Sequence, residues 1–151
     1  MHLKICPIGY VENNIGKQSD ENWGSVVSSI RLKDDYIGGL SGLEDFSHVM
    51  ILTYLHEAQF VKEKHLKRHP RNSADMPLLG IFSQRGKDRP NPIGVTTVRI
   101  IEVLEDTLLV EGLDAINGTP VIDIKPYYPQ YDKVDNANVP EWVERLMKKY
   151  F

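Results

Sequence analysis

The stretch that decides the fold is Gly80–Asp132, GIFSQRGKDRPNPIGVTTVRIIEVLEDTLLVEGLDAINGTPVIDIKPYYPQYD. Within it, residues 95–104 and 108–112 are predicted to be strands, and the short polar link Glu105-Asp106-Thr107 joins them. Two apolar strand patterns separated by so short a link predict an antiparallel β-hairpin. The rest of the chain can be interpreted outward from this hairpin.

Two turn-rich, charged clusters flank the predicted hairpin. The first is RGKDRPNPIG at 85–94, and the second comprises GLD at 112–114 and NGTPVIDIKPY at 117–127. A hairpin that carries both clusters at its far end would set them side by side. We interpret the pair of clusters as a functional site.

Further strands are predicted at residues 3–11, 25–32 and 46–56. The last of these is apolar on both alternating sets, as expected of a strand covered on both faces, although a buried helix is the alternative. Residues 36–43 contain three glycines and predict a tight connection rather than a helix. Residues 57–76 form a long, basic, polar segment of the kind that tends to be functional or mobile.

One helix is predicted, near the carboxyl end. Trp142, Leu146 and Tyr150 would share one face, with Asn138 or Val139 as the N-cap and Pro140 in the first turn. Short strands with Gly/Pro turns and one helix predict a mainly β fold, a small antiparallel β-barrel with short connecting segments, with a sandwich-like sheet as the alternative. The whole chain, 1–151, is expected to be a single domain.

Composition bounds the possible functions. The chain is 41% hydrophobic and 26% charged, and no apolar run is long enough to span a membrane. A single cysteine, Cys6, predicts a cytoplasmic protein and an inert thiol buried in the first strand. The formal net charge of −3 argues against coating nucleic acid by bulk charge, although a local basic face stays open.

Each candidate motif also has a structural interpretation. The prolines on either side of Asn91 stiffen their turn whether or not it binds anything. The Asn117-Gly118 step is typical of a plain hairpin corner, and Asp123 and Lys125 share a strand face and can form a simple ion pair. The basic residues of 57–76 form either a solvated loop or a phosphate contact. We expect no metal site, because His65 and His69 lie among cations.

The sequence carries no G-x-G-x-x-G motif and no Walker loop, so a nucleotide cofactor would have to be held by other means. A carboxylate beside exposed backbone amides, as at Asp114 and Asp123, suits the ribose and amine groups of an adenosyl ligand.

FSQRGKDRPNPIG (82–94), GLDAINGTPVIDIKPYYPQYD (112–132) and the upstream GLSGLEDFSHVMILTYLHEA (39–58) closely resemble the signatures of the TrmO (TsaA-like, YaeB-like) family. The resemblance implies a small β-barrel methyltransferase that uses S-adenosylmethionine and forms a homodimer with the cofactor near the interface. It implies methylation of N6 on the threonylcarbamoyl-modified adenosine beside a tRNA anticodon.

The same resemblance implies positions for the site. The cofactor-binding residues would be Arg85, Arg89, Pro90, Asn91, Ile93, Gly94, Leu113, Asp114, Gly118, Thr119 and Lys125. The catalytic candidates are Asp123, Tyr127 and Asp114, any of which could accept or relay the proton that N6 loses. Two other functions stay open: a non-catalytic S-adenosylmethionine-binding regulator, and a methyltransferase that acts on a small molecule.

Overall fold

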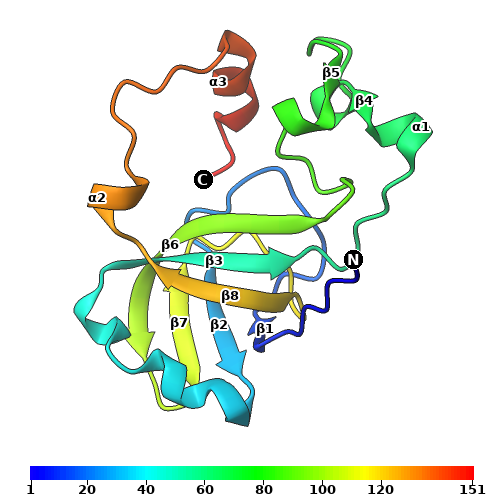
Figure 1. Cartoon of the computed structure of the whole chain (residues 1–151). Helices are drawn as coiled ribbons and strands as arrows, with labels where there is room; N and C mark the ends of the chain where they lie inside the picture. The colour runs from blue at the N-terminus through cyan, green and yellow to red at the C-terminus, as the bar shows by residue number, and fades with distance from the viewer.

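Six strands form a closed antiparallel barrel in the computed structural model, which describes residues 1–151 (Figure 1). Neighbouring strands pair in the order β1-β2-β7-β6-β3-β8, and β8 pairs with β1 to close the ring. The strands are β1 (Gly9–Glu12), β2 (Val27–Leu32), β3 (His48–Tyr54), β6 (Ile93–Val103), β7 (Thr107–Glu111) and β8 (Pro120–Pro126). The predicted antiparallel barrel is therefore confirmed, and the sandwich alternative is wrong.

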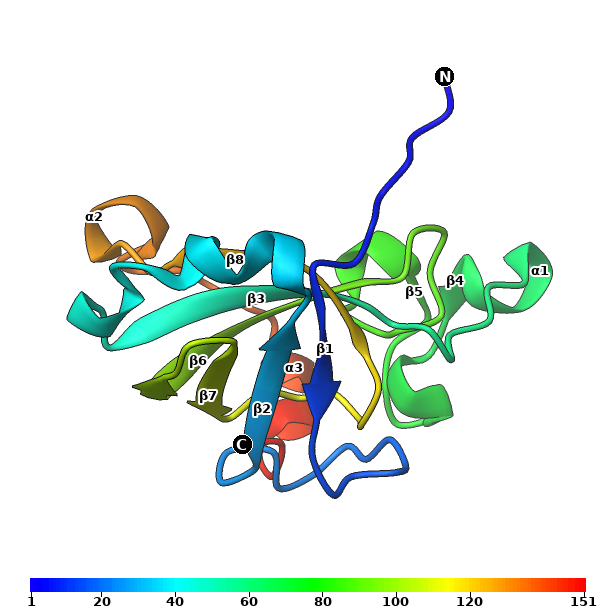
Figure 2. The same cartoon turned by 90° about the horizontal axis from the view of Figure 1, so that it is seen from below.

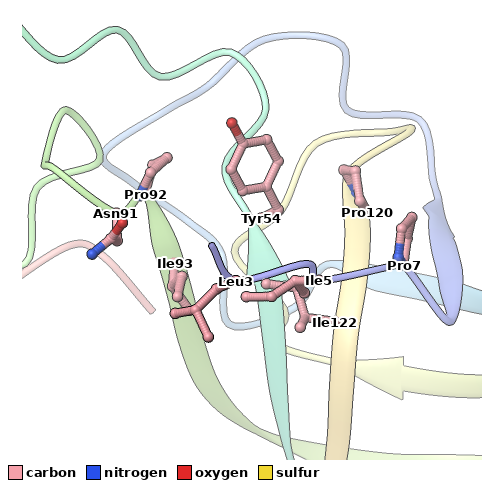
Figure 3. Close-up of a pocket in the computed structure, with 9 residues that line it drawn as sticks. All are labelled: Leu3, Ile5, Pro7, Tyr54, Asn91, Pro92, Ile93, Pro120 and Ile122. Atoms are coloured by element: carbon pink, nitrogen blue, oxygen red, sulfur yellow. The ribbon is translucent and has the colours of Figure 1, made fainter. Parts of the chain in front are cut away.

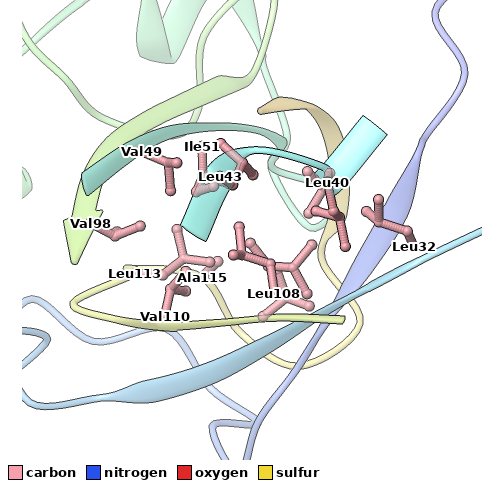
Figure 4. Packing of buried hydrophobic residues seen from close by; sticks show 13 residues of the cluster. Leu32, Leu40, Leu43, Val49, Ile51, Val98, Leu108, Val110, Leu113 and Ala115 are labelled. Carbon is pink, nitrogen blue, oxygen red and sulfur yellow. The ribbon is translucent and has the colours of Figure 1, made fainter. Parts of the chain in front are cut away.

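The core fills the inside of the barrel. In β3, Val49, Ile51 and Thr53 are buried and alternate with less buried side chains, so β3 is a strand and the helix alternative is excluded. Val49 and Ile51 lie across the interior from Val110 and Leu113 (Figure 4). The alternation defines an outer face of the sheet, on which His48, Met50, Leu52 and Tyr54 lie.

The two polar clusters meet at one end of the barrel by a different route from the one predicted. The β6–β7 hairpin exists, but β6 continues six residues beyond the pairing of Arg99 with Glu111. The two clusters are therefore not neighbours at the end of the hairpin. They come together across the end of β3, because Thr53 pairs with Gly94 on one side and with Val121 on the other.

Three local predictions are wrong. Residues 3–7 lie outside any strand, because β1 begins only at Gly9, and Cys6 is exposed rather than buried. The glycine-rich connection contains a 3₁₀ helix, η1 (Asp34–Leu40), followed by η2 (Leu43–Asp45). Buried Leu40 and Leu43 anchor these turns to the core, so tertiary packing outweighs the low helix propensity of glycine.

The polar segment after β3 is folded into a lobe beside the barrel (Figure 1, green). It contains α1 (Lys62–His65), β4 (Lys67–Arg68), η3 (Pro70–Asn72), β5 (Leu79–Gly80) and η4 (Ile81–Ser83). Lys67 pairs with Gly80, so β4 forms a two-stranded sheet with β5. β5 lies after the polar segment, which ends at residue 76. We call residues 57–92 the basic lobe.

The carboxyl-terminal segment contains α2 (Pro129–Asp132) and α3 (Glu141–Met147). The predicted helix is confirmed, but its N-cap is Pro140, and Tyr150 lies beyond its end. The chain then turns back to the barrel, where the N–H groups of Asn22 and Trp23 donate to the carbonyls of Lys149 and Tyr150. No helix of the chain is long and apolar enough to cross a membrane.

Candidate functional site

A cavity of about 330 Å³ lies on the outer face of the barrel where β6, β3 and β8 run side by side. Its walls come from these strands and from the amino-terminal segment that crosses them (Figure 3). The lining residues are Leu3, Ile5, Pro7, Tyr54, Asn91, Pro92, Ile93, Pro120 and Ile122. A mainly apolar hollow of this size with a few polar groups is typical of a small-molecule site.

The first polar cluster forms the wall on the β6 side. Ile93 pairs with Tyr54, and the N–H of Leu55 donates to the carbonyl of Pro92 at 2.8 Å. Because prolines flank Asn91, the backbone around it is stiff and its amide is held at the rim of the cavity.

The second polar cluster forms the opposite wall. Gly118 has a φ of +81° and its N–H donates to the carbonyl of Val11 at 2.7 Å, while the buried hydroxyl of Thr119 donates to the carbonyl of Ile116. These two residues build the corner from which β8 begins, and Pro120 at its end lines the cavity. The two clusters thus flank Tyr54 from opposite sides (Figure 3).

A β-bulge in β8 sets which side chains face the cavity. Leu52 pairs with Asp123 and Thr53 with Val121, which leaves Ile122 as the extra residue. Val121 therefore stays in the core while Ile122 lines the cavity, and Asp123 follows it on the outer face opposite Leu52. Without the extra residue, Asp123 would share the inward direction of Val121.

Asp123 and Lys125 form the ion pair that their spacing allows. The Lys125 Nζ atom lies 2.7 Å from the carboxylate of Asp123, which also accepts the N–H of Ile124 at 2.9 Å. The hydrogen bond to Asp123, together with its negative charge, raises the pKa of Lys125. A carboxylate has about four lone-pair sites, so Asp123 keeps acceptor capacity for a ligand.

Arg85, Arg89 and Gly94 have structural contacts in this chain. The Arg85 guanidinium donates to the carbonyl of Val95 at 2.9 Å, and Arg89 donates to the carbonyls of Gln84 and Gly86. A Cβ on Gly94 would lie 2.5 Å from the Thr53 hydroxyl, so close packing against β3 requires glycine there.

Three predicted residues lie away from the cavity. Leu113 is buried in the core, and Asp114 accepts hydrogen bonds from Thr96 and Tyr150 on the inner side of β6. Burial, together with the negative charge of Asp114, raises the pKa of the Tyr150 hydroxyl, which therefore stays protonated as the donor. Tyr127 pairs with His48 at the far end of β3, about 20 Å from Tyr54 at the usual strand rise.

Several lining residues carry no recognisable sequence signal. Tyr54 ends an apolar strand and is 46% exposed, while Leu3 and Ile5 belong to a segment that pairs with no strand. Ile122 resembles any alternating strand residue until the bulge is known. The only hint in the sequence is that Val121 and Ile122 are both apolar, which interrupts the alternation of the residues that follow. Such a pair can place one side chain in the core and the next on the outer face.

Comparisons with a family profile and with individual proteins point to the same family. Residues 11–133 match the sequence profile of the tRNA-methyltransferase O N-terminal domain. An S-adenosyl-L-methionine-binding protein from Archaeoglobus fulgidus is 36% identical over 135 residues, which cover 87% of this chain and 94% of that protein. A human tRNA (adenine(37)-N6)-methyltransferase is 42% identical over 149 residues, which cover 92% of this chain but 33% of that protein.

The fold is also similar to that of solved structures. A crystal structure of TrmO from Pseudomonas aeruginosa superimposes with a TM-score of 0.77 at 29% identity, covering 94% of this chain and 62% of that chain. The chain therefore spans less than two thirds of that structure and about a third of the human protein.

Proposed function

This chain belongs to the tRNA-methyltransferase O family, and from that membership we propose that it transfers a methyl group from S-adenosylmethionine to N6 of an adenosine in tRNA. The acceptor we propose is the threonylcarbamoyl-modified adenosine beside the anticodon. The observation that carries the proposal is the cavity on β3, because both polar clusters of the family resemblance form its walls.

The cavity fits the chemistry of an adenosyl ligand. Ile93, Ile122 and Pro120 offer apolar surface, Asn91 offers one amide, and the ring of Tyr54 faces the same space. An aromatic ring attracts a cation held over its face, which suits a sulfonium. S-adenosylmethionine would supply a methyl group that is already activated, so the task of the chain is to bind and orient donor and acceptor.

We propose Asp123 as the group that accepts the proton lost by N6. Its carboxylate lies on the outer face, one residue after Ile122 of the cavity wall, and keeps acceptor capacity beside its contact with Lys125. Asp114 and Tyr127 remain weaker candidates, because the cavity of a single chain lies on a different face from Asp114 and at the other end of β3 from Tyr127.

The remaining predicted residues then divide by role. Arg85 is exposed near the β6 side of the cavity and is our candidate for the carboxylate of the donor or a phosphate of the acceptor. Arg89 and Thr119, which donate hydrogen bonds to backbone carbonyls, are proposed to hold the two corners in shape.

The test is transfer of a labelled methyl group. The chain is incubated with labelled S-adenosylmethionine and tRNA that carries or lacks the threonylcarbamoyl group. We expect label only in the modified tRNA. Label in neither tRNA would contradict the proposed activity, and label in both would contradict the proposed acceptor.

A second candidate is a non-catalytic S-adenosylmethionine-binding protein. The relative from Archaeoglobus fulgidus is named only for binding S-adenosylmethionine, which favours this alternative. Donor binding at the cavity without transfer to either tRNA would support it.

We also propose a homodimer formed through the outer face of β6 and β3. Ile93, Val95 and Tyr54 are exposed there beside half-buried Leu52, and Leu3 and Ile5 extend the apolar surface across the cavity. An apolar face of this kind is typical of an interaction surface. Sedimentation equilibrium is expected to give a dimer that Val95→Lys dissociates, whereas a monomeric wild-type chain would contradict the proposal.

A further inference from the structure

We propose that the basic lobe, together with the end of α3, binds the phosphate backbone of the RNA whose base enters the cavity. This inference rests on the proposed function and names the surface that holds its substrate. The lobe lies beside the barrel in both views, on the side opposite α2 (Figures 1 and 2).

Charge is segregated between the lobe and the barrel. Residues 57–92 contain eight of the 18 Lys and Arg residues but only four of the 21 Asp and Glu residues, a formal charge of +4. The remaining residues carry a formal charge of −7. The acidic total of the chain therefore hides one basic face, and binding to phosphates depends on that face rather than on the total.

The lobe presents cations that have no acidic partner. Its ion pairs use Arg68, Lys87 and Arg71, which leaves Lys62, Lys64 and Lys67 exposed and without a partner. Such side chains can neutralise phosphates without first breaking an internal contact. Phe82, 79% exposed on the same lobe, offers a ring on which an unpaired base can stack.

The basic surface continues onto the carboxyl-terminal segment. A cavity of about 210 Å³ between η3 and α3 is lined by Arg71, Arg145, Lys148 and Lys149, with Glu21 and Leu146. Two of these cations are tied to acids, Arg71 to Asp20 and Arg145 to Glu141, whereas Lys148 and Lys149 are free. A phosphate on this cavity would meet more positive than negative groups.

Internal contacts hold the lobe together, and its last two residues line the cavity on β3. The Arg68 guanidinium lies 3.7 Å from the carboxylate of Asp88, which also accepts the N–H of Gln59 at 2.9 Å. The Gln84 amide donates to the carbonyls of Arg68 and Leu79. Because Asn91 and Pro92 are the last two residues of the lobe and line the cavity, RNA backbone contacts on the lobe would set the position of a base relative to that cavity.

The experiment measures binding of a labelled tRNA transcript by fluorescence anisotropy between 50 and 200 mM KCl. Lys64→Gln/Lys67→Gln is compared with Lys33→Gln/Lys133→Gln, which removes the same charge from the barrel side. We expect the lobe variant to bind about tenfold or more weakly, with its salt slope reduced by about 1.5, and the control to stay within about twofold. Phe82→Ala should weaken binding with the slope unchanged.

Several outcomes would overturn the inference. An equal loss in both lysine variants would mean that only net charge matters and that the lobe is not the interface. Unchanged tRNA binding in the lobe variant, with binding of an acidic peptide lost instead, would assign the lobe to a protein partner. Wild-type protein that binds S-adenosylmethionine in calorimetry but no tRNA would overturn both this surface and the tRNA substrate. Wild-type protein that binds tRNA but no S-adenosylmethionine would contradict the proposed function alone.

Discussion

Replacing Asp123 with Asn is expected to lower kcat for methyl transfer to tRNA by about 10²–10⁴-fold, the range for removal of a general base. The amide keeps the shape of the carboxylate but cannot take the proton from N6. Asp123 lies beside the cavity wall without lining it, so the Kd for S-adenosylmethionine should change by no more than about threefold. Single-turnover transfer and calorimetric binding measure the two effects separately.

Two further variants make this result decisive. Glu102→Gln removes an exposed carboxylate elsewhere on β6 and should leave kcat unchanged. Asp114→Asn weakens the contacts with Thr96 and Tyr150 and should mainly lower thermal stability. If Asp114→Asn instead loses transfer activity in a stable protein while Asp123→Asn keeps it, the proton acceptor is Asp114.

Replacing Asp88 with Asn should destabilise the chain by about 1–3 kcal/mol, because it leaves a largely buried guanidinium without its carboxylate. Asp88 is the only acidic group that forms an ion pair with Arg68, whose Nε atom is buried with no hydrogen bond. The lobe should loosen together with the Asn91 turn, so donor affinity should fall as well. Urea unfolding and calorimetry measure the two effects, and Asp75→Asn on the same lobe is the matched control.

The contribution of Asp88 should also depend on pH. Burial acts to raise its pKa, but the hydrogen bonds from Gln59 and Lys87 outweigh it, so the pKa of Asp88 lies below its usual 3.8. A carboxyl whose pKa is lowered by folding stabilises the protein above the unfolded value and loses that effect as the pH falls through the folded one. The stability gap between wild type and Asp88→Asn should therefore close below about pH 4. A gap that persists at pH 2 would show that Asp88 acts through shape rather than charge.

Local patterns were sufficient for most of the barrel. Apolar patterning located β2, β3, β6 and β7 to within two residues at each end. The expectation that β3 is covered on both faces is wrong, because only its inward-facing residues Val49, Ile51 and Thr53 are buried. The same rule failed at residues 3–7, which are apolar but lie on the outside of the sheet next to the cavity. An apolar run predicts burial, but here Leu3 and Ile5 are 82% and 56% exposed in the single chain, so the pattern did not indicate a strand.

The two polar corners could be recognised from turn chemistry, but their meeting place could not. The sequence suggested the end of a hairpin, whereas the corners actually meet across β3, a strand some 40 residues earlier than the first of them. Pairing of distant strands depends on how the barrel closes, which no local pattern encodes. The contact of Tyr150 with Asp114 was unpredictable for the same reason.

The extra residue in β8, Ile122, changes which side chains of the strand face the core. Before it, odd-numbered side chains face inward, as Val121 does, and after it the even-numbered Ile124 packs on the core. The side chains at positions 123 and 125 therefore do not pack in the core. Substitutions at these two positions on the outer face of β8 can change the reactive groups without changing the residues of the core. The chemistry of the site and the stability of the barrel can therefore evolve independently in this fold.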